Sequence, residues 1–138
     1  EKGCDAVEPD NVQGYLEPTG FDFDAQDQLA YNRFIANEAH RRGLGVGLKN
    51  ALEQVELLVD YFDFSINEQC FQYNECDLLL PFIRAGKPVL NAEYPEDEGQ
   101  LDRSAIASLC NAADKVKFST LVLPVALDDS FRVACQDR

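Results

Sequence analysis

The stretch Cys4-Asp5-Ala6-Val7-Glu8-Pro9-Asp10-Asn11 joins a short apolar segment to a run of polar side chains. We expect a strand over residues 5–8 that delivers Glu8, Asp10 and Asn11 at its carboxyl end, as many α/β folds present catalytic groups. A later segment, Phe62-Asp63-Phe64-Ser65-Ile66-Asn67-Glu68, ends in the same way. Two such strands predict a hydrolase that works with a pair of carboxylates.

Strand-like and helix-like segments alternate along the chain. The first helix is expected to begin after its N-cap Asp24, with Asp27 in a capping-box-like pair, and to end near Arg42 before Gly43. The four-residue spacing predicts that its apolar face carries Ala30, Tyr31, Phe34, Ile35 and Ala39. The other predicted strands cover residues 44–50, 62–67, 87–93 and 118–123, and the other predicted helices cover 52–60, 77–85 and 101–115.

This alternation indicates an α/β fold with a parallel sheet and right-handed crossovers. The sheet could be open and doubly wound, or it could be part of an eight-stranded barrel. An open nucleotide-binding sheet should carry a glycine-rich turn after its first strand. Here that turn is Glu8-Pro9-Asp10-Asn11, which would repel phosphate. Part of a barrel is therefore favoured.

Length and charge restrict the class of protein. The 138 residues have the size of a single domain, 1–138, and no apolar run approaches the roughly 18 residues that a membrane span needs. The net charge of −13 argues against nucleic acid and against anionic membranes, which both require basic patches. Neutral or cationic partners fit better, although an acidic surface that aids solubility would give the same charge.

Five cysteines with no CxxC motif and a single His40 leave no plausible metal site, and no cofactor is indicated. Two pairs and one remainder fit disulfides in an oxidising compartment. We expect Cys70–Cys76 across a short loop and Cys110–Cys135 between a late helix and the tail, which leaves Cys4 unpaired or joined to another segment. Five buried thiols in a cytosolic protein would be the alternative.

Polar residues end four of the predicted strands, and in a barrel they would converge on one face. Lys49 points inward by alternation and could pair with a carboxylate or contact a sugar, while Tyr94 could stack on a sugar or simply pack. His40 lies in the last turn of a helix, away from these ends. The candidate site residues are Glu8, Asp10, Asn11, Lys49, Asn50, Asn67, Glu68, Gln69, Glu93 and Tyr94.

Four segments that carry these residues resemble glycoside hydrolase family 114, whose members are endo-α-1,4-polygalactosaminidases and related secreted proteins. They are Gly3-Cys4-Asp5-Ala6-Val7-Glu8-Pro9-Asp10-Asn11, Gly47-Leu48-Lys49-Asn50-Ala51, Asn67-Glu68-Gln69-Cys70-Phe71-Gln72-Tyr73 and Asn91-Ala92-Glu93-Tyr94. The resemblance runs almost end to end, and it covers the second half of a (β/α)8 barrel, about strands four to eight. It implies a secreted protein with the first three βα units absent from this sequence.

The resemblance also implies a retaining glycosidase, with Asp10 as nucleophile and Glu68 as acid/base; the swapped roles remain open. Glu8, Asn11, Lys49, Asn50, Asn67, Gln69, Glu93 and Tyr94 would bind substrate or orient the carboxylates. Polygalactosamine is cationic where it is deacetylated, so Glu96, Asp97 and Glu98 in the acidic loop would help to bind its amines. The last strand ends in Leu121-Val122-Leu123-Pro124, without the polar terminus of the others.

A partial barrel would leave two edge strands whose backbone N–H and C=O groups have no neighbouring strand to pair with. The rest of the barrel is therefore expected from the same or another polypeptide, or from a second copy. A non-catalytic carbohydrate-binding or structural extracellular protein, built on the same barrel, is the alternative function.

Overall fold

A computed structural model describes residues 3–94 and 102–137 of the chain. Six strands form one sheet with the sequential order β1-β2-β3-β4-β5-β6, and β1 to β5 are all parallel. The strands are β1 Ala6–Val7, β2 Gly45–Lys49, β3 Phe64–Glu68, β4 Val89–Glu93, β5 Ser119–Val122 and β6 Val133–Ala134. The α-helices are α1 Ala25–Arg41, α2 Val55–Leu58, α3 Cys70–Tyr73, α4 Leu80–Arg84 and α5 Arg103–Val116.

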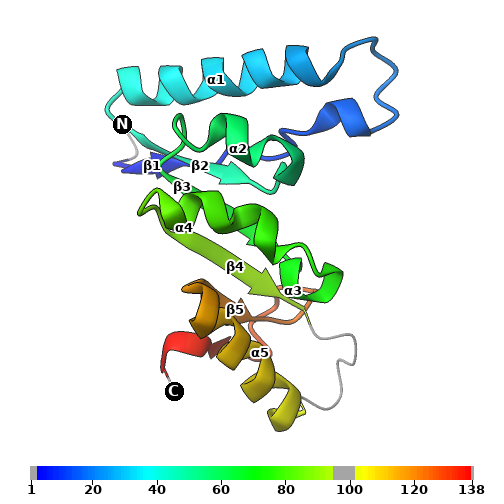
Figure 1. Ribbon diagram of the computed structural model, residues 1–138, viewed down its shortest axis with the longest axis vertical. Helices are drawn as coiled ribbons and strands as arrows, with labels where there is room; N and C mark the ends of the chain where they lie inside the picture. The colour runs from blue at the N-terminus through cyan, green and yellow to red at the C-terminus, as the bar shows by residue number, and fades with distance from the viewer. Residues whose placement is uncertain (1–2, 95–101, 138) are drawn as a thin grey trace.

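The sequential order of the parallel strands distinguishes a barrel from a doubly wound sheet, whose order reverses at a switch point. In Figure 1 the βα units follow one another from α1 at the top to α5 near the bottom. The fold is α/β, with parallel βα repeats that form part of a (β/α)8 barrel, as the sequence predicts.

The two faces of the sheet differ in burial. Val46, Leu48 and Val89 point to the helical side and are fully buried. On the other side, which we call the inner face, Leu90 remains 42% exposed and its neighbour Ile66 is half-buried. The core therefore lies between the sheet and its helices, and the inner face is open.

Gly47 lies on the inner face, where a side chain would not fit. A Cβ atom added to it would lie 2.4 Å from Cε2 of Phe64, its partner on β3. Glycine at this position therefore leaves room for the phenyl ring.

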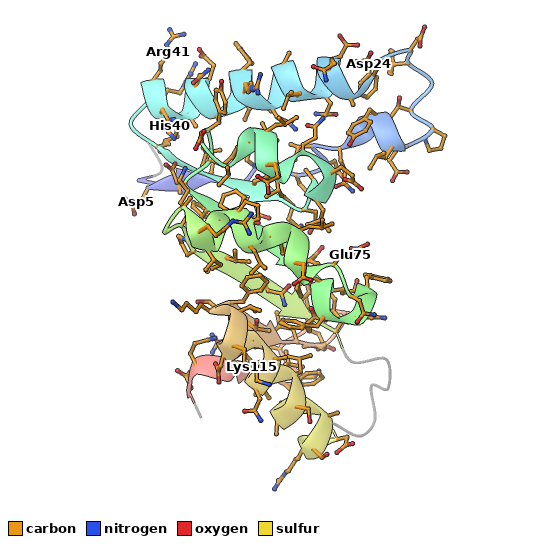
Figure 2. All side chains as sticks on the ribbon, in the orientation of Figure 1. Asp5, Asp24, His40, Arg41, Glu75 and Lys115 are labelled. Carbon is orange, nitrogen blue, oxygen red and sulfur yellow. A yellow bond between two sulfur atoms is a disulfide. The ribbon has the colours of Figure 1, made fainter. Side chains whose placement is uncertain are left out.

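Helix α1 begins and ends as the sequence predicts. Asp24 accepts hydrogen bonds from Gln26 N and Asp27 N, and Asp27 accepts from Asp24 N, which completes the capping box. Figure 2 shows Asp24 at this end of the helix and His40 with Arg41 at the other. Gly43, at φ 72°, provides the left-handed turn that ends the helix.

The predicted apolar face of α1 is correct for Ile35 and Ala39, which pack into the core, and wrong for Ala30, Tyr31 and Phe34. Tyr31 and Phe34 are 57% and 58% exposed, and they stack on each other with ring centroids 6.4 Å apart. The fully buried residues of α1 are Gln28, Leu29, Asn32, Ala36 and Ala39. The polar residues Gln28 and Asn32 can lie in this interface because the segments that follow β1 and β2 supply them with hydrogen-bond partners.

Smaller differences from the prediction affect the short helices and the tail. The segment 52–60 is a 3₁₀ turn, Leu52–Gln54, followed by α2, and the cysteine loop contains α3. The tail forms β6, which pairs antiparallel with the end of β5. Neither β6 nor the residues around it carry an alternation long enough to predict a strand.

Both predicted disulfides are present. Cys70–Cys76 joins the start of α3 to the 3₁₀ helix Cys76–Leu79, and Cys110–Cys135 joins α5 to the tail. Cys4 is exposed and free. The helices of the described ranges are all too short or too polar to cross a membrane.

Candidate active site

Five of the predicted residues meet on the inner face at the carboxyl ends of the parallel strands. Lys49 ends β2 and Glu68 ends β3, while Glu8 and Asp10 follow β1 and Tyr94 follows β4. The register pairs Lys49 with Ile66 and Glu68 with Ala92, so both charged side chains share the inner face.

Lys49 lies between three carboxylates. Its Nζ atom is 3.4 Å from Glu68 Oε2, 3.5 Å from Asp10 Oδ1 and 3.7 Å from Glu8 Oε1. The lysine side chain is only 13% exposed, whereas that of Asp10 is 62% exposed. A largely shielded ammonium group therefore lies close to acids from two strand ends.

The shared cation limits the separation of the predicted catalytic pair. Asp10 Oδ1 and Glu68 Oε2 lie 3.5 Å and 3.4 Å from the same Nζ atom, so the sum of these distances, 6.9 Å, is their largest possible separation. Retaining glycosidases hold their two carboxyl groups about 5–5.5 Å apart, and this range lies within the limit.

The charge balance keeps Lys49 protonated. Burial acts to lower its pKa, but attraction to Glu68, Asp10 and Glu8 outweighs burial and raises the pKa above the ordinary value for lysine. The cluster of one cation and three acids is accordingly acidic overall, which suits a cationic or electron-poor ligand.

Tyr94 donates a hydrogen bond from its hydroxyl group to Glu68 Oε1 at 2.6 Å. Burial, followed by this hydrogen bond and the nearby charges of Glu68 and Glu93, raises the pKa of Tyr94 strongly. The tyrosine therefore remains a proton donor to Glu68 across the physiological pH range. Its predicted alternatives were sugar stacking and plain packing; the structure shows a direct contact with an acid of the site.

The predicted amides form the layer next to the acids. Asn50 Oδ1 accepts hydrogen bonds from Glu68 N at 3.0 Å and from the buried Asn67 Nδ2 at 3.1 Å. Gln69 follows Glu68 and has a left-handed backbone conformation, and its side-chain amide donates a hydrogen bond to Gln72 Oε1. Asn11 is exposed and lines a hollow of about 270 Å³ with Asp10 and Lys49.

Glu93 is not brought to the other acids. It ends β4 on the helical side, is 3% exposed, and accepts hydrogen bonds from Phe71 N and Asn91 Nδ2, each at 2.9 Å. Burial raises the pKa of its carboxyl group, although these hydrogen bonds counteract the shift. The contact with Phe71 N holds the start of α3 against β4. Successive side chains of a strand point to opposite faces, so the next residue, Tyr94, lies on the inner face.

His40 also lies away from the site. Its Nε2 atom is 2.9 Å from Asp63 Oδ2, and Asp63 in turn accepts a hydrogen bond from Val46 N at 2.8 Å. These contacts lie at the amino ends of β2 and β3, opposite to the acids. Glu96, Asp97 and Glu98 of the acidic loop lie outside the described residues.

Several polar residues around the site were not predicted. Gln13 Oε1 accepts from Ala51 N at 2.8 Å, which joins the loop after β1 to the turn after β2. Asn32 on α1 donates to Val12 O at 2.9 Å and to Gln54 Oε1 at 3.2 Å. The available signal was the helical spacing of Gln28 and Asn32 beside Leu29 and Ala36, which puts two amides on the side of the helix that carries small and apolar residues.

A second concave surface, of about 380 Å³, follows the inner face below the acids. It is lined by Glu8, Lys49, Ile66, Asn67, Glu68, Leu90, Asn91, Ala92, Ser119, Leu121 and Gln136. No three His, Cys, Asp or Glu residues within 3–94 and 102–137 are arranged to hold a metal ion.

Sequential parallel strands with acids at their carboxyl ends are typical of (β/α)8-barrel enzymes, among them glycoside hydrolases that use a pair of carboxylates. Comparison with known proteins agrees: the model of Glycoside-hydrolase family GH114 matches residues 1–138. The chain belongs to this family.

A solved structure gives the same fold. The chain is 37% identical to Ega3 of Aspergillus fumigatus, crystallised in complex with galactosamine, and superposes with a TM-score of 0.86. The match covers 96% of this chain and 55% of the Ega3 chain, so the chain spans about half the length of that protein. No curated protein matches.

Proposed function

We propose that this chain supplies the catalytic half of a secreted, retaining glycoside hydrolase that cleaves α-1,4-linked galactosamine-containing polysaccharide. The observation that carries the proposal is the juxtaposition of Asp10 and Glu68 across Lys49. The two carboxylate oxygens are at most 6.9 Å apart and come from two strand ends of a barrel, which supports the spacing of about 5–5.5 Å that a double displacement needs.

In the proposed reaction, Asp10 attacks the anomeric carbon and forms a glycosyl ester. Glu68 gives its proton to the glycosidic oxygen as the bond to the leaving sugar breaks. Glu68 then takes a proton from water, whose oxygen attacks the same carbon and releases Asp10 as carboxylate. The configuration at the anomeric carbon is thus retained, and both acids return to their initial protonation states.

The galactosamine bound to Ega3 supports a sugar amine as ligand. The cluster here carries three acids against one lysine, and the chain has a net charge of −13, so a cationic polymer would be attracted. Steering of this kind weakens with salt. If kcat/KM on a cationic galactosamine polymer did not fall between low and high salt, charge would have no part in encounter.

We infer that the barrel is completed by further βα units from the same or another polypeptide. The open inner face and the 55% coverage of Ega3 support this inference. The two disulfides support a secreted protein, since such bonds persist in oxidising compartments.

The proposal is tested on the complete barrel with α-1,4-galactosamine oligomers. Asp10→Asn and Glu68→Gln should each lower kcat by at least about 100-fold, because each removes one step of proton or glycosyl transfer. The matched control is Asp60→Asn, an exposed acid on the helical side. Activity that survives both substitutions would eliminate the mechanism, and binding without turnover in the unsubstituted protein would favour the non-catalytic carbohydrate-binding alternative.

The two roles can be separated with azide and a substrate that has a good leaving group. If Asp10 is the nucleophile, its replacement by Gly should give a glycosyl azide of inverted configuration. Replacement of Glu68 by Ala should give the retained azide, because the glycosyl ester still forms. The opposite pattern would exchange the roles of the two acids.

A further inference from the structure

Two consecutive residues after β2 have left-handed backbone conformations. Asn50 has φ 49° and Ala51 has φ 52°. Asparagine tolerates this region, but for alanine it costs about 1–2 kcal/mol. Ala51 is also 1% exposed, so neighbouring structure must hold it in place.

The contacts of this turn run in two directions. On one side, Asn50 Oδ1 accepts hydrogen bonds from Glu68 N and from Asn67 Nδ2. On the other side, Ala51 N donates to Gln13 Oε1. The turn lies between the strand that ends in Glu68 and the loop that follows Asp10.

The Asp10 side of this arrangement is itself fixed. Val12 is 3% exposed, its carbonyl oxygen accepts from the fully buried Asn32, and Gly14 N donates to Gln28 Oε1. Hydrogen bonds therefore hold the loop from Val12 to Gly14 against α1. Gln13 in this loop accepts a hydrogen bond from Ala51 N, so the turn after β2 is held to the same loop.

We propose that Asn50 and Gln13 are positioning residues that set the distance between Asp10 and Glu68. The Asn50–Ala51 turn holds the two segments at a fixed distance. The side-chain oxygen of Asn50 accepts a hydrogen bond from the backbone of Glu68, and the backbone amide of Ala51 donates to Gln13 in the loop that follows Asp10. The inference rests on the proposed function for its catalytic consequence. It assigns to Asn50 a role toward the protein backbone in place of sugar binding.

A carboxylate spacing of 5–5.5 Å requires this kind of support. Asp10 lies in an exposed loop, and its contact with Lys49 is a long hydrogen bond of 3.5 Å, which constrains its position only weakly. A misplacement of about 1 Å at a reacting group can cost about 100-fold in rate. Directional hydrogen bonds to the backbone on both sides supply the missing constraint.

The test compares Asn50→Gly with Asn50→Asp in the complete barrel. Glycine retains the left-handed conformation but removes the acceptor, so the Glu68 amide should exchange its hydrogen at least about 10-fold faster. In the same variant kcat should fall by about 10- to 100-fold with little change in KM. Aspartate retains an oxygen acceptor, so Glu68 amide protection should persist and kcat, compared at each variant's own pH optimum, should recover.

The matched control is Asn74→Gly. Asn74 is also left-handed, at φ 58°, but it ends α3 and is exposed. It should leave both the Glu68 amide and kcat unchanged. Gln13→Ala, with Gln13→Glu as its conservative partner, tests the other side of the turn through the Ala51 amide.

The outcomes separate this inference from the proposed function. Unchanged protection of the Glu68 amide in Asn50→Gly, or lost protection with wild-type kcat, would overturn the positioning role alone. An inactive unsubstituted barrel would overturn the proposed function and the catalytic consequence with it, while amide exchange would still report whether the turn holds Glu68. A raised KM at constant kcat would instead assign Asn50 to sugar binding.

Discussion

The ammonium group of Lys49 lies 3.4 Å from Glu68, and the same nitrogen lies 3.5 Å from Asp10. Removing that charge should disturb the geometry of the site, because the carboxylates of Glu8, Asp10 and Glu68 would then lose the cation that they share. In Lys49→Met, kcat/KM on galactosamine oligomers should therefore fall by about 10- to 100-fold. Lys115→Met, which replaces an exposed lysine on α5, is the control and should leave kcat/KM unchanged. An unchanged kcat/KM in Lys49→Met would show that the cation does not hold the acids in place.

The hydroxyl group of Tyr94 is a second contact of Glu68 that can be tested by substitution. Tyr94→Phe removes the 2.6 Å hydrogen bond while it retains the ring, so kcat should fall by about 10-fold because the acid loses a directional partner. Tyr73→Phe removes a hydroxyl group from an exposed ring and should have no effect. A large rise in KM for Tyr94→Phe, with kcat unchanged, would point to sugar contact in place of contact with Glu68.

Gly47 should resist substitution because of Phe64. Gly47→Ala places a methyl group 2.4 Å from the ring and should cost about 1–3 kcal/mol in the free energy of unfolding, measured with urea. Gly45→Ala meets its nearest atom only at 3.4 Å and should cost less. In a Phe64→Ala background the penalty of Gly47→Ala should largely disappear. An equal penalty in both backgrounds would mean that the ring is not the obstacle.

Asp63 should make stability depend on pH. Burial acts to raise the pKa of its carboxyl group, but hydrogen bonds from His40 and Val46 N and nearby positive charges bring it below the ordinary value. A depressed folded-state pKa stabilises the protein above the unfolded value, and this stabilisation is lost as the pH falls through the folded value. Asp63→Asn should therefore lower Tm at pH 7, and the difference from wild type should vanish near pH 2. A constant difference across that range would contradict the assignment.

The two disulfides should contribute unequally. Cys110–Cys135 closes a separation of 25 residues and Cys70–Cys76 one of 6. Chain entropy then assigns about 3.5 kcal/mol to the first and about 2.4 kcal/mol to the second. Urea unfolding of the Cys110→Ala/Cys135→Ala and Cys70→Ala/Cys76→Ala proteins checks this order. The reverse order would indicate that contacts in the native loop, and not chain entropy, dominate.

Much of the fold follows from local signals. The capping box at Asp24, the glycine at Gly43 and the alternation along β2 each determine structure within a few residues. For the same reason the strand ends carrying Asp10 and Glu68 could be located from the sequence. The two cysteine pairs followed from their positions on neighbouring elements.

The features that the sequence did not predict depend on distant partners. Gln28 and Asn32 are buried because the loop after β1 accepts and donates to them, and periodicity alone assigned that side of α1 to solvent. Gln13 reaches a turn far along the chain. Whether the side chain of Glu93 points to the inner face or to the helices depends on the register of β4. The sequence does not predict the ends of a strand to within one residue, so it could not settle this direction.

The open inner face has a practical consequence for solubility. Ile66 and Leu90 are paired across β3 and β4, and Leu121 of β5, which pairs with Ala92, lies on the same face; all three apolar side chains are only partly covered and form one strip. Expressed alone, these 138 residues should form soluble oligomers or precipitate, despite a net charge of −13 that opposes association. Co-expression with the units that cover the strip should yield a monodisperse species, so colloidal behaviour reports whether the barrel has closed.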